Sequence, residues 1–168
     1  MEKKAPLFHF KYLLHDIVKW FGSWQLLLFY RLKISYDGEE SKKKHWRGAI
    51  IISNHVGYSD PFIMQCMFPY RRFYFLAADI MFKKKVVAWI YRHIFLTESI
   101  NRDKPALQTI KYAAGVAKRG NFMCIFPEGH INREVGKVDS FKGGAVLMAY
   151  MADVSIIPCY HEKRKSIW

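Results

Sequence analysis

The stretch that decides the fold is AIIISNHVGYSDPF, residues 49–62. Its first four residues are apolar and mostly β-branched, which is typical of a strand buried on both faces. A polar, glycine-containing turn follows. Asp60-Pro61 then predicts a helix start, with Asp60 at the N-cap and Pro61 at the first helical position. His55 therefore lies just past the carboxyl end of a strand, where open α/β folds bind their ligands.

A histidine and a carboxylate joined by such a short turn can touch. A carboxylate on one ring nitrogen fixes the tautomer and leaves the other nitrogen free to take a proton from a hydroxyl. The alternative is that Asp60 only caps a helix and His55 is an ordinary loop residue. Because His93 and Glu98 have the same spacing, spacing alone does not decide. The strand–turn–helix context around His55 favours the catalytic interpretation.

Size and composition indicate one globular domain with a basic surface. The chain has 168 residues, 51% of them hydrophobic and 17% aromatic, and a formal net charge of +13. Such a charge predicts an anionic partner, which could be a phosphate ligand, an anionic membrane surface or nucleic acid. We expect no specific nucleic-acid binding, because no sequence signature of a nucleic-acid-binding fold is present.

The three cysteines predict a reduced, cytosolic-facing protein. Cys66, Cys124 and Cys159 are scattered, odd in number and set in apolar sequence, which is typical of core thiols. No Cys/His cluster has metal-binding spacing. We also expect no cleaved signal peptide, since no small-residue cleavage site follows the basic N-terminus.

Residues 7–33 predict one amphipathic helix, rich in Trp, Phe and Leu and interrupted by charges. Its longest uncharged run is residues 20–30, shorter than the roughly 20 residues that a membrane span needs. Aromatic residues flanked by Lys and Arg favour a helix lying in the membrane interface, while a helix packed on the core is the alternative. We therefore divide the chain into a membrane-interface helix, residues 1–33, and a main domain, residues 45–168.

The remaining chain alternates predicted strands and helices. Strands are expected at residues 73–78, 95–100, 122–126 and 154–159, and helices at 61–67, 81–94, 104–119 and 141–152. This order predicts an α/β fold with a mixed, largely parallel sheet flanked by helices. Arg102 follows one strand, where a guanidinium can hold a phosphate, although pairing with Asp103 is an open alternative. Glu128 follows another strand on a Pro/Gly-bounded turn.

Four blocks in this order resemble the glycerolipid acyltransferase family, in particular the bacterial 1-acylglycerol-3-phosphate acyltransferases. The resemblance covers about residues 50–159. It is carried by Asn54-His55 with Asp60, by Arg102, by Phe126-Pro127-Glu128-Gly129 and by the strand at residues 154–158.

The resemblance implies that a fatty acyl group passes from acyl-CoA or acyl-carrier protein, without another cofactor, to the free hydroxyl of lysophosphatidic acid, giving phosphatidic acid. It implies His55 as general base and Asp60 as its orienting partner. The implied acceptor-binding residues are Arg102, Glu128 and Gly129, with added positive charge from Arg133 and Lys142. A basic, amphipathic protein of this kind is expected at the cytoplasmic face of the cell membrane, as a peripheral or monotopic protein.

Two departures from the family pattern leave alternatives open. His130 and Ile131 stand where the family usually has Thr or Ser and then Arg, which favours another lysophospholipid or an aminolipid as a possible acceptor. The chain also ends soon after the fourth block, so we expect the C-terminal part of the family fold to be missing. A non-catalytic peripheral membrane relative is the further alternative, and a wide separation of His55 and Asp60 would favour it.

Overall fold

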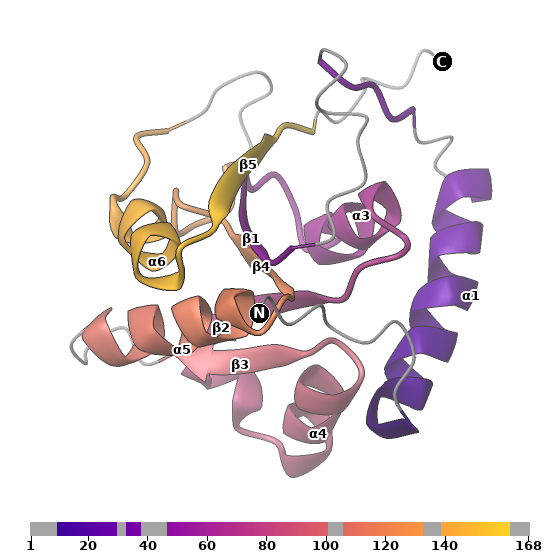
Figure 1. Ribbon diagram of the computed structural model, residues 1–168. Helices are drawn as coiled ribbons and strands as arrows, with labels where there is room; N and C mark the ends of the chain where they lie inside the picture. Colours follow the sequence, from indigo (N-terminus) through magenta and orange to yellow (C-terminus); the bar gives the residue numbers. More distant parts are fainter. Residues whose placement is uncertain (1–9, 30–32, 38–46, 101–105, 133–138, 162–168) are drawn as a thin grey trace.

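The computed structural model describes residues 10–29, 33–37, 47–100, 106–132 and 139–161 (Figure 1). The α-helices are α1 (Leu13–Phe29), α3 (Asp60–Met67), α4 (Lys85–His93), α5 (Ala106–Lys118) and α6 (Gly144–Ala152). The strands are β1 (Ala49–Ser53), β2 (Phe73–Ala78), β3 (Thr97–Ile100), β4 (Phe122–Ile125) and β5 (Ser155–Cys159). Two short 3-10 helices are η1 (Phe10–Tyr12) and η2 (Asp79–Phe82).

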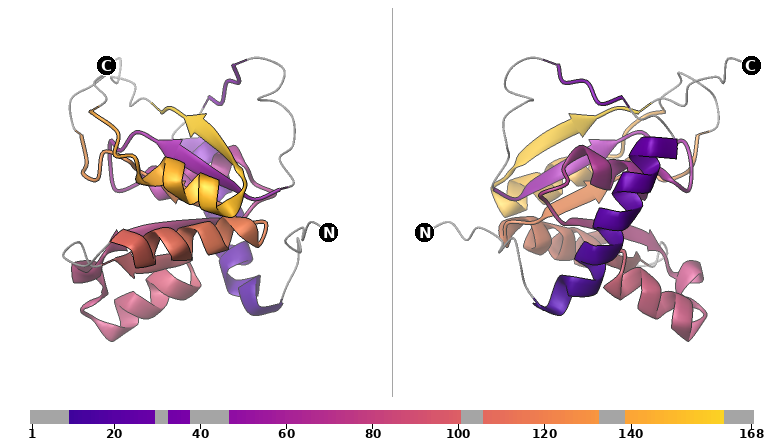
Figure 2. Two further views of the ribbon diagram at one scale, coloured as in Figure 1. Left: turned by 60° about the vertical axis from the view of Figure 1, so that its left-hand side comes forward. Right: turned by 90° about the vertical axis from the view of Figure 1, so that its right-hand side faces the viewer.

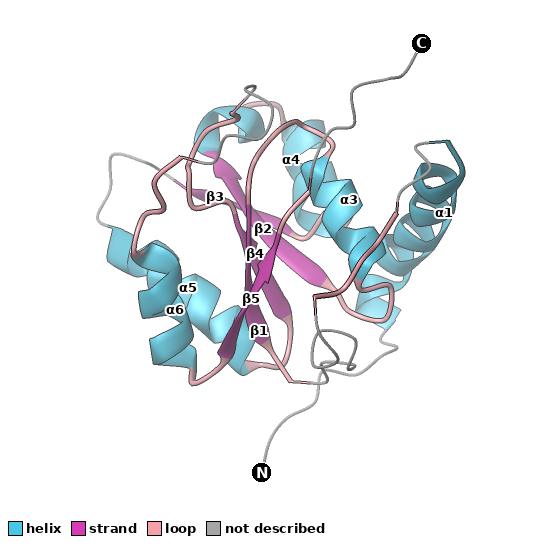
Figure 3. Cartoon of the chain, turned by 90° about the horizontal axis from the view of Figure 1, so that it is seen from above, coloured by secondary structure: helices cyan, strands magenta, loops and turns pink. Residues whose placement is uncertain are grey.

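The strands form one sheet in the order β3-β2-β4-β1-β5, and every pairing between them is parallel. Parallel strands need crossover connections, which the helices supply. Seen from above, α5 and α6 cover one face of the sheet, while α3 and then α1 cover the other (Figure 3). The predicted α/β fold with a largely parallel sheet is therefore confirmed.

Strand β1 packs into a separate hydrophobic cluster on each face of the sheet. Ile50 contacts the α5–α6 side together with Met123, while Ile51 contacts the α3 side together with Met64 and Phe122. Both Ile50 and Ile51 are 0% exposed. Because successive side chains of a strand point to opposite faces, a strand buried on both faces must be apolar throughout. This explains the uninterrupted apolar run from which the prediction started.

Helix α1 docks on the domain through polar side chains. The Arg72 guanidinium donates to both carboxylate oxygens of Asp16, at 2.9 Å and 2.5 Å. The Lys19 ammonium donates to the backbone carbonyls of Arg71 and Phe68, at the end of α3. Burial lowers the pKa of Lys19 to about 8, partly opposed by the nearby Asp16 charge. The inward face of α1 is therefore the charged one.

The opposite face of α1 presents large apolar side chains to solvent. In the right-hand view of Figure 2, α1 lies nearest the viewer, in front of the sheet. Seven side chains on η1 and α1, spaced mainly three and four residues apart, are between 45% and 82% exposed: Phe10, Leu14, Ile17, Trp20, Phe21, Trp24 and Leu28. They form what we call the apolar stripe, and packing on the core does not account for it. No helix in the described part of the chain is long and apolar enough to cross a bilayer.

Several predicted element boundaries are wrong: the helix expected over residues 7–33 is η1 and then α1 within the described residues, two strands are one residue shorter than expected, and three further elements differ. The helix expected over residues 81–94 is instead η2 and α4, separated where Lys84 takes an extended conformation. The strand expected from Phe95 begins at Thr97, because Leu96 has a positive φ of 48° that no strand accommodates. Helix α6 begins at Gly144 rather than at residue 141.

The ion pair between α1 and Arg72, the residue before β2, is tested by Asp16→Asn. We expect the free energy of unfolding to fall by about 1–3 kcal/mol, since Arg72 is mostly buried and loses a charged partner. Chemical denaturation measures the change. The control is Asp79→Asn, on exposed η2, which should stay within about 0.5 kcal/mol of the parent. If both variants unfold alike, the ion pair does not stabilise the docked helix.

Candidate active site

The loop between β1 and α3 holds the two residues that the sequence singled out. His55 follows β1, and Asp60 is the first residue of α3. The N-cap is Ser59, so the prediction of Asp60 at that position is wrong by one residue. Ser59 makes no side-chain capping bond. The Asp60 carboxylate instead turns back into the loop that precedes the helix.

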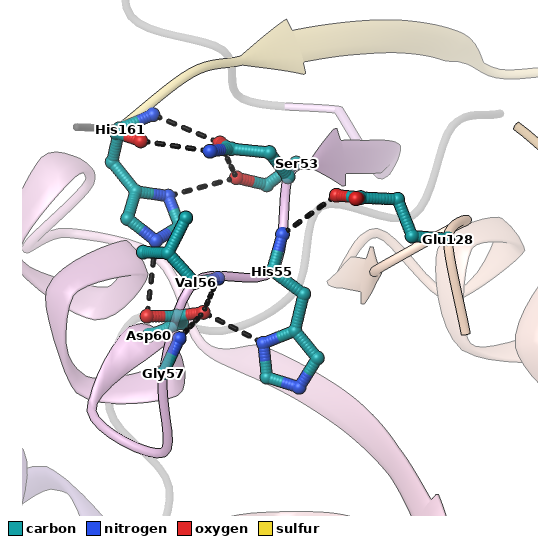
Figure 4. A network of polar contacts seen from close by, with 8 residues as sticks. Ser53, His55, Val56, Gly57, Asp60, Glu128 and His161 are labelled. Carbon is teal, nitrogen blue, oxygen red and sulfur yellow. Dashed lines mark hydrogen bonds and ion pairs between the residues drawn. The ribbon is translucent and has the colours of Figure 1, made fainter. Parts of the chain in front are cut away.

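Three donors converge on one oxygen of Asp60. The His55 Nδ1 lies 2.6 Å from Oδ2, and the backbone N–H groups of Val56 and Gly57 donate to the same oxygen at 2.8 Å and 2.9 Å (Figure 4). A carboxylate only accepts, so His55 carries its ring proton on Nδ1. The loop wraps around the carboxylate, and the second ring nitrogen, Nε2, keeps its lone pair.

Asp60 is a buried, ionised carboxylate. It is 0% exposed, and burial by itself opposes ionisation. Hydrogen bonds from His161, His55 and the Gly57 N–H outweigh that cost and hold the pKa of Asp60 well below its usual range. The side chain therefore carries a fixed negative charge beside His55.

His55 is held on three sides but stays open to solvent. Its ring stacks on Phe126 with centroids 4.3 Å apart and an angle of 18° between the planes. Its backbone N–H donates to Glu128 Oε1 at 2.9 Å, and its carbonyl accepts from the Asn132 N–H at 2.7 Å. The side chain is 20% exposed. In Figure 4 the nitrogen not bonded to Asp60 points away from that carboxylate. A fixed ring with one accessible lone pair can accept a proton.

Glu128 joins two loops at the carboxyl edge of the sheet. Its Oε1 accepts from the His55 N–H, and its Oε2 accepts from the Asp139 N–H at 3.2 Å. The residue is 4% exposed. Both oxygens are therefore engaged by backbone groups, so Glu128 braces the loop that carries His55. Its contact with an acceptor stays a prediction.

Gly129, which directly follows Glu128, lies close to Lys142. Gly129 has a φ of +76°, and a side chain there would start 3.2 Å from the Lys142 ammonium. Lys142 is exposed, and its backbone N–H donates to the Pro127 carbonyl at 3.3 Å. The loop thus places a cationic group next to a glycine. Arg102 and Arg133, the other predicted cations, lie outside the described residues.

His130 occupies the position where the sequence departs from the family pattern. Its Nε2 lies 3.0 Å from Asp139 Oδ2, and its Nδ1 lies 3.1 Å from the Glu128 carbonyl. The departure therefore introduces an ion-pairing group directly after Glu128 and Gly129.

His161 is a site residue that the sequence did not predict. This residue follows β5, and its Nε2 lies 3.0 Å from Asp60 Oδ1. Only the strand register brings it to the site: β5 pairs in parallel with β1, with Cys159 opposite Ser53. His161 and His55 each follow that pair by two residues, so both histidines reach the same edge of the sheet.

The second His/acid pair with the same spacing behaves differently. His93 Nδ1 lies 3.0 Å from the Trp89 carbonyl within α4, and Glu98 lies 3.6 Å from Arg92. Spacing alone thus brings no histidine to a carboxylate, whereas the strand–turn–helix context does. Among the residues that the structure describes, no group of His, Cys, Asp or Glu side chains could hold a metal ion.

Comparisons with known proteins identify the family of the chain. A family model described as Acyltransferase matches residues 33–162. A 1-acyl-sn-glycerol-3-phosphate acyltransferase from Streptococcus pneumoniae is 32% identical over 65% of this chain. A protein of the same name from Limnanthes douglasii is 30% identical over 79% of it. The crystal structure of the 1-acyl-sn-glycerophosphate acyltransferase PlsC from Thermotoga maritima, 24% identical, superposes with a TM-score of 0.60 over 88% of this chain.

The lengths of these proteins differ from that of the chain. The chain spans 39% of the Streptococcus protein, 46% of the Limnanthes protein and 56% of the Thermotoga structure. The family match itself covers most of the chain and includes the loops that carry His55, Glu128 and His161. The chain therefore belongs to the acyltransferase family.

Proposed function

We propose that this domain transfers a fatty acyl group from a thioester to the free hydroxyl of lysophosphatidic acid, giving phosphatidic acid. The observation that carries the proposal is the 2.6 Å contact between His55 Nδ1 and Asp60 Oδ2. His55 Nε2 takes the hydroxyl proton while the oxygen attacks the thioester carbonyl. The C–S bond then breaks, and the leaving thiolate takes the proton from the imidazolium. Asp60 fixes the tautomer and stabilises the positive charge that forms on His55.

The acceptor phosphate needs cationic partners near this histidine. Lys142, exposed beside Gly129, is the described candidate, and we assign Arg102 and Arg133 the same role from the resemblance. The basic surface suits the phosphates of acyl-CoA or the acidic acyl-carrier protein as donor. His130 with Asp139 favours a second candidate acceptor, a lysophospholipid or aminolipid with a different head group, because this pair stands beside the acceptor loop. The short His55–Asp60 contact argues against a non-catalytic relative.

A labelled acyl-CoA and lysophosphatidic acid in anionic detergent–lipid micelles test the reaction. We expect the parent chain to form phosphatidic acid and His55→Ala to lose at least about 100-fold in rate, since it removes the general base. His93→Ala is the matched control and should keep the parent rate, because His93 has the same spacing to an acid without contacting it. Turnover retained by His55→Ala would remove its role. If the parent is inert with both acyl-CoA and acyl-carrier protein, the proposed reaction is wrong.

We further propose that the protein binds the cytoplasmic face of the cell membrane as a peripheral or monotopic protein. The apolar stripe of α1 supports this, because its large side chains face outward while the charged side chains face the domain. A second exposed group lies on α4, where Val86 and Trp89 follow the lysines at residues 83–85. Such surfaces insert apolar groups at the lipid boundary and attract anionic head groups.

Membrane binding is tested by Trp20→Ser with Trp24→Ser in the apolar stripe. Deleting residues 1–33 would also remove Asp16 and Lys19 and weaken the fold, so outward substitutions are the cleaner change. We expect partitioning into anionic vesicles, measured by sedimentation, to fall by at least about 100-fold, because burial of one large side chain is worth about 1.5–3 kcal/mol and the variant loses two. The control is Tyr150→Ser with Val146→Ser, which alters exposed apolar groups on α6, on the opposite face of the sheet. Equal losses in both pairs would contradict a role specific to α1.

A further inference from the structure

Each oxygen of the Asp60 carboxylate faces a different imidazole. Oδ2 contacts His55 Nδ1 at 2.6 Å, and Oδ1 lies 3.0 Å from His161 Nε2. Asp60 is 0% exposed, so neither oxygen can rely on water. Oδ2 also accepts from two loop N–H groups, whereas within the described residues His161 is the neighbour of Oδ1. The two histidines therefore contact different oxygens of the same carboxylate (Figure 4).

His161 is itself held in place by the end of β1. Its backbone N–H donates to Asn54 Oδ1 at 3.0 Å, and the Asn54 amide donates back to the His161 carbonyl at 2.8 Å. Its Nδ1 lies 3.2 Å from the Ser53 hydroxyl. The His161 side chain is 11% exposed, and Ser53 and Asn54 are buried. Backbone and ring are thus both fixed, which a loop histidine without a role does not require.

The proton positions follow from the partners. The Asp60 carboxylate can only accept, while the Ser53 hydroxyl lies 3.2 Å from His161 Nδ1 and 3.5 Å from Asn54 Oδ1 and can donate to either. With its proton on Nε2, the His161 ring places a donor 3.0 Å from Asp60 Oδ1, an electrostatic contact without hydrogen-bond alignment. Ser53, His161, Asp60 and His55 form one chain of close polar contacts that leads to His55 Nδ1. Within the ranges that the structure describes, the groups that contact His161 are Asp60 from α3, Ser53 from β1 and Asn54 directly after it, and Asp60 is the charged one among these three.

We propose that His161 is a positioning residue, which anchors the Asp60 carboxylate from β5 and thereby sets the orientation and basicity of His55. This inference rests on the proposed function, because His161 acts on acyl transfer only through Asp60 and His55. Without the His161 ring, Oδ1 is left buried without a neighbouring donor and the plane of the carboxylate is less firmly set, although the two loop N–H groups keep Oδ2 beside His55. More of its negative charge is then also concentrated on the contact with His55.

The test uses the full chain with His161→Ala and His161→Gln, beside the His93→Ala control. We expect His161→Ala to lower kcat about 10- to 100-fold, an effect of the size of one polar contact to a charged group, with KM changed less than about threefold. The acidic limb of the pH–rate profile should move to higher pH, because the undivided Asp60 charge holds the imidazolium proton more strongly. His161→Gln, whose amide supplies a donor at a similar reach, should recover activity to within about fivefold of the parent.

A second measurement needs no turnover. In protein labelled with ¹⁵N-histidine, the proton resonance of His55 Nδ1–H should shift in His161→Ala, return toward the parent position in His161→Gln and stay unchanged in His93→Ala. An unchanged resonance together with parent kcat in His161→Ala overturns the proposal. If circular dichroism shows that His161→Ala does not fold, the proposal is tested with His161→Gln and Ser53→Ala instead. Parent values of kcat, pH profile and His55 resonance in Ser53→Ala would count against the contact chain.

The two measurements separate this inference from the proposed reaction. A parent protein without acyl transfer, whose His55 resonance still responds to His161→Ala, contradicts the reaction and leaves the anchoring contact supported. An active parent whose His55 resonance and pH profile ignore His161 contradicts the anchoring contact and leaves the reaction supported.

Discussion

The buried negative charge of Asp60 is the constraint on which the site depends. A carboxylate removed from water persists only where hydrogen bonds replace its hydration. Two loop N–H groups and the His55 imidazole donate to one oxygen here, and the His161 imidazole lies 3.0 Å from the other. To bring these donors together, the chain must fold the loop after β1 back on itself and lay the end of β5 beside it. The tautomer of His55 follows from satisfying this charge.

The site lies at one edge of a parallel sheet, in a domain whose helix α1 turns its apolar side chains outward. Because β4, β1 and β5 are neighbouring parallel strands, the residues that follow them meet at one edge: Glu128, His55 and His161. Helix α1 reverses the usual pattern, with the Asp16–Arg72 pair inside and aromatic side chains outside. A histidine placed to accept a proton and an outward-facing apolar stripe therefore occur in one small domain, the combination that the proposed reaction at a membrane uses.

The sequence predicted features set by local chemistry and missed those set by tertiary packing. The apolar run of β1 and the short turn from His55 to Asp60 are local, and both are found as expected. The N-cap was misplaced because Asp60 bonds its own loop instead of the first helical turn. The positive φ of Leu96 has no sequence signature in a β-branched, apolar context. His161 escaped notice because its partner lies about a hundred residues earlier, joined only through the register of β5 on β1.

A double-mutant cycle of His55→Ala and Asp60→Asn, read by acyl transfer to lysophosphatidic acid, tests the central claim most directly. If Asp60 acts through His55, each single change should slow transfer by at least about 100-fold. The double variant should be no slower than His55→Ala, because the carboxylate has no base left to orient. Losses that multiply, or an Asp60→Asn protein that turns over like its parent, would contradict the account.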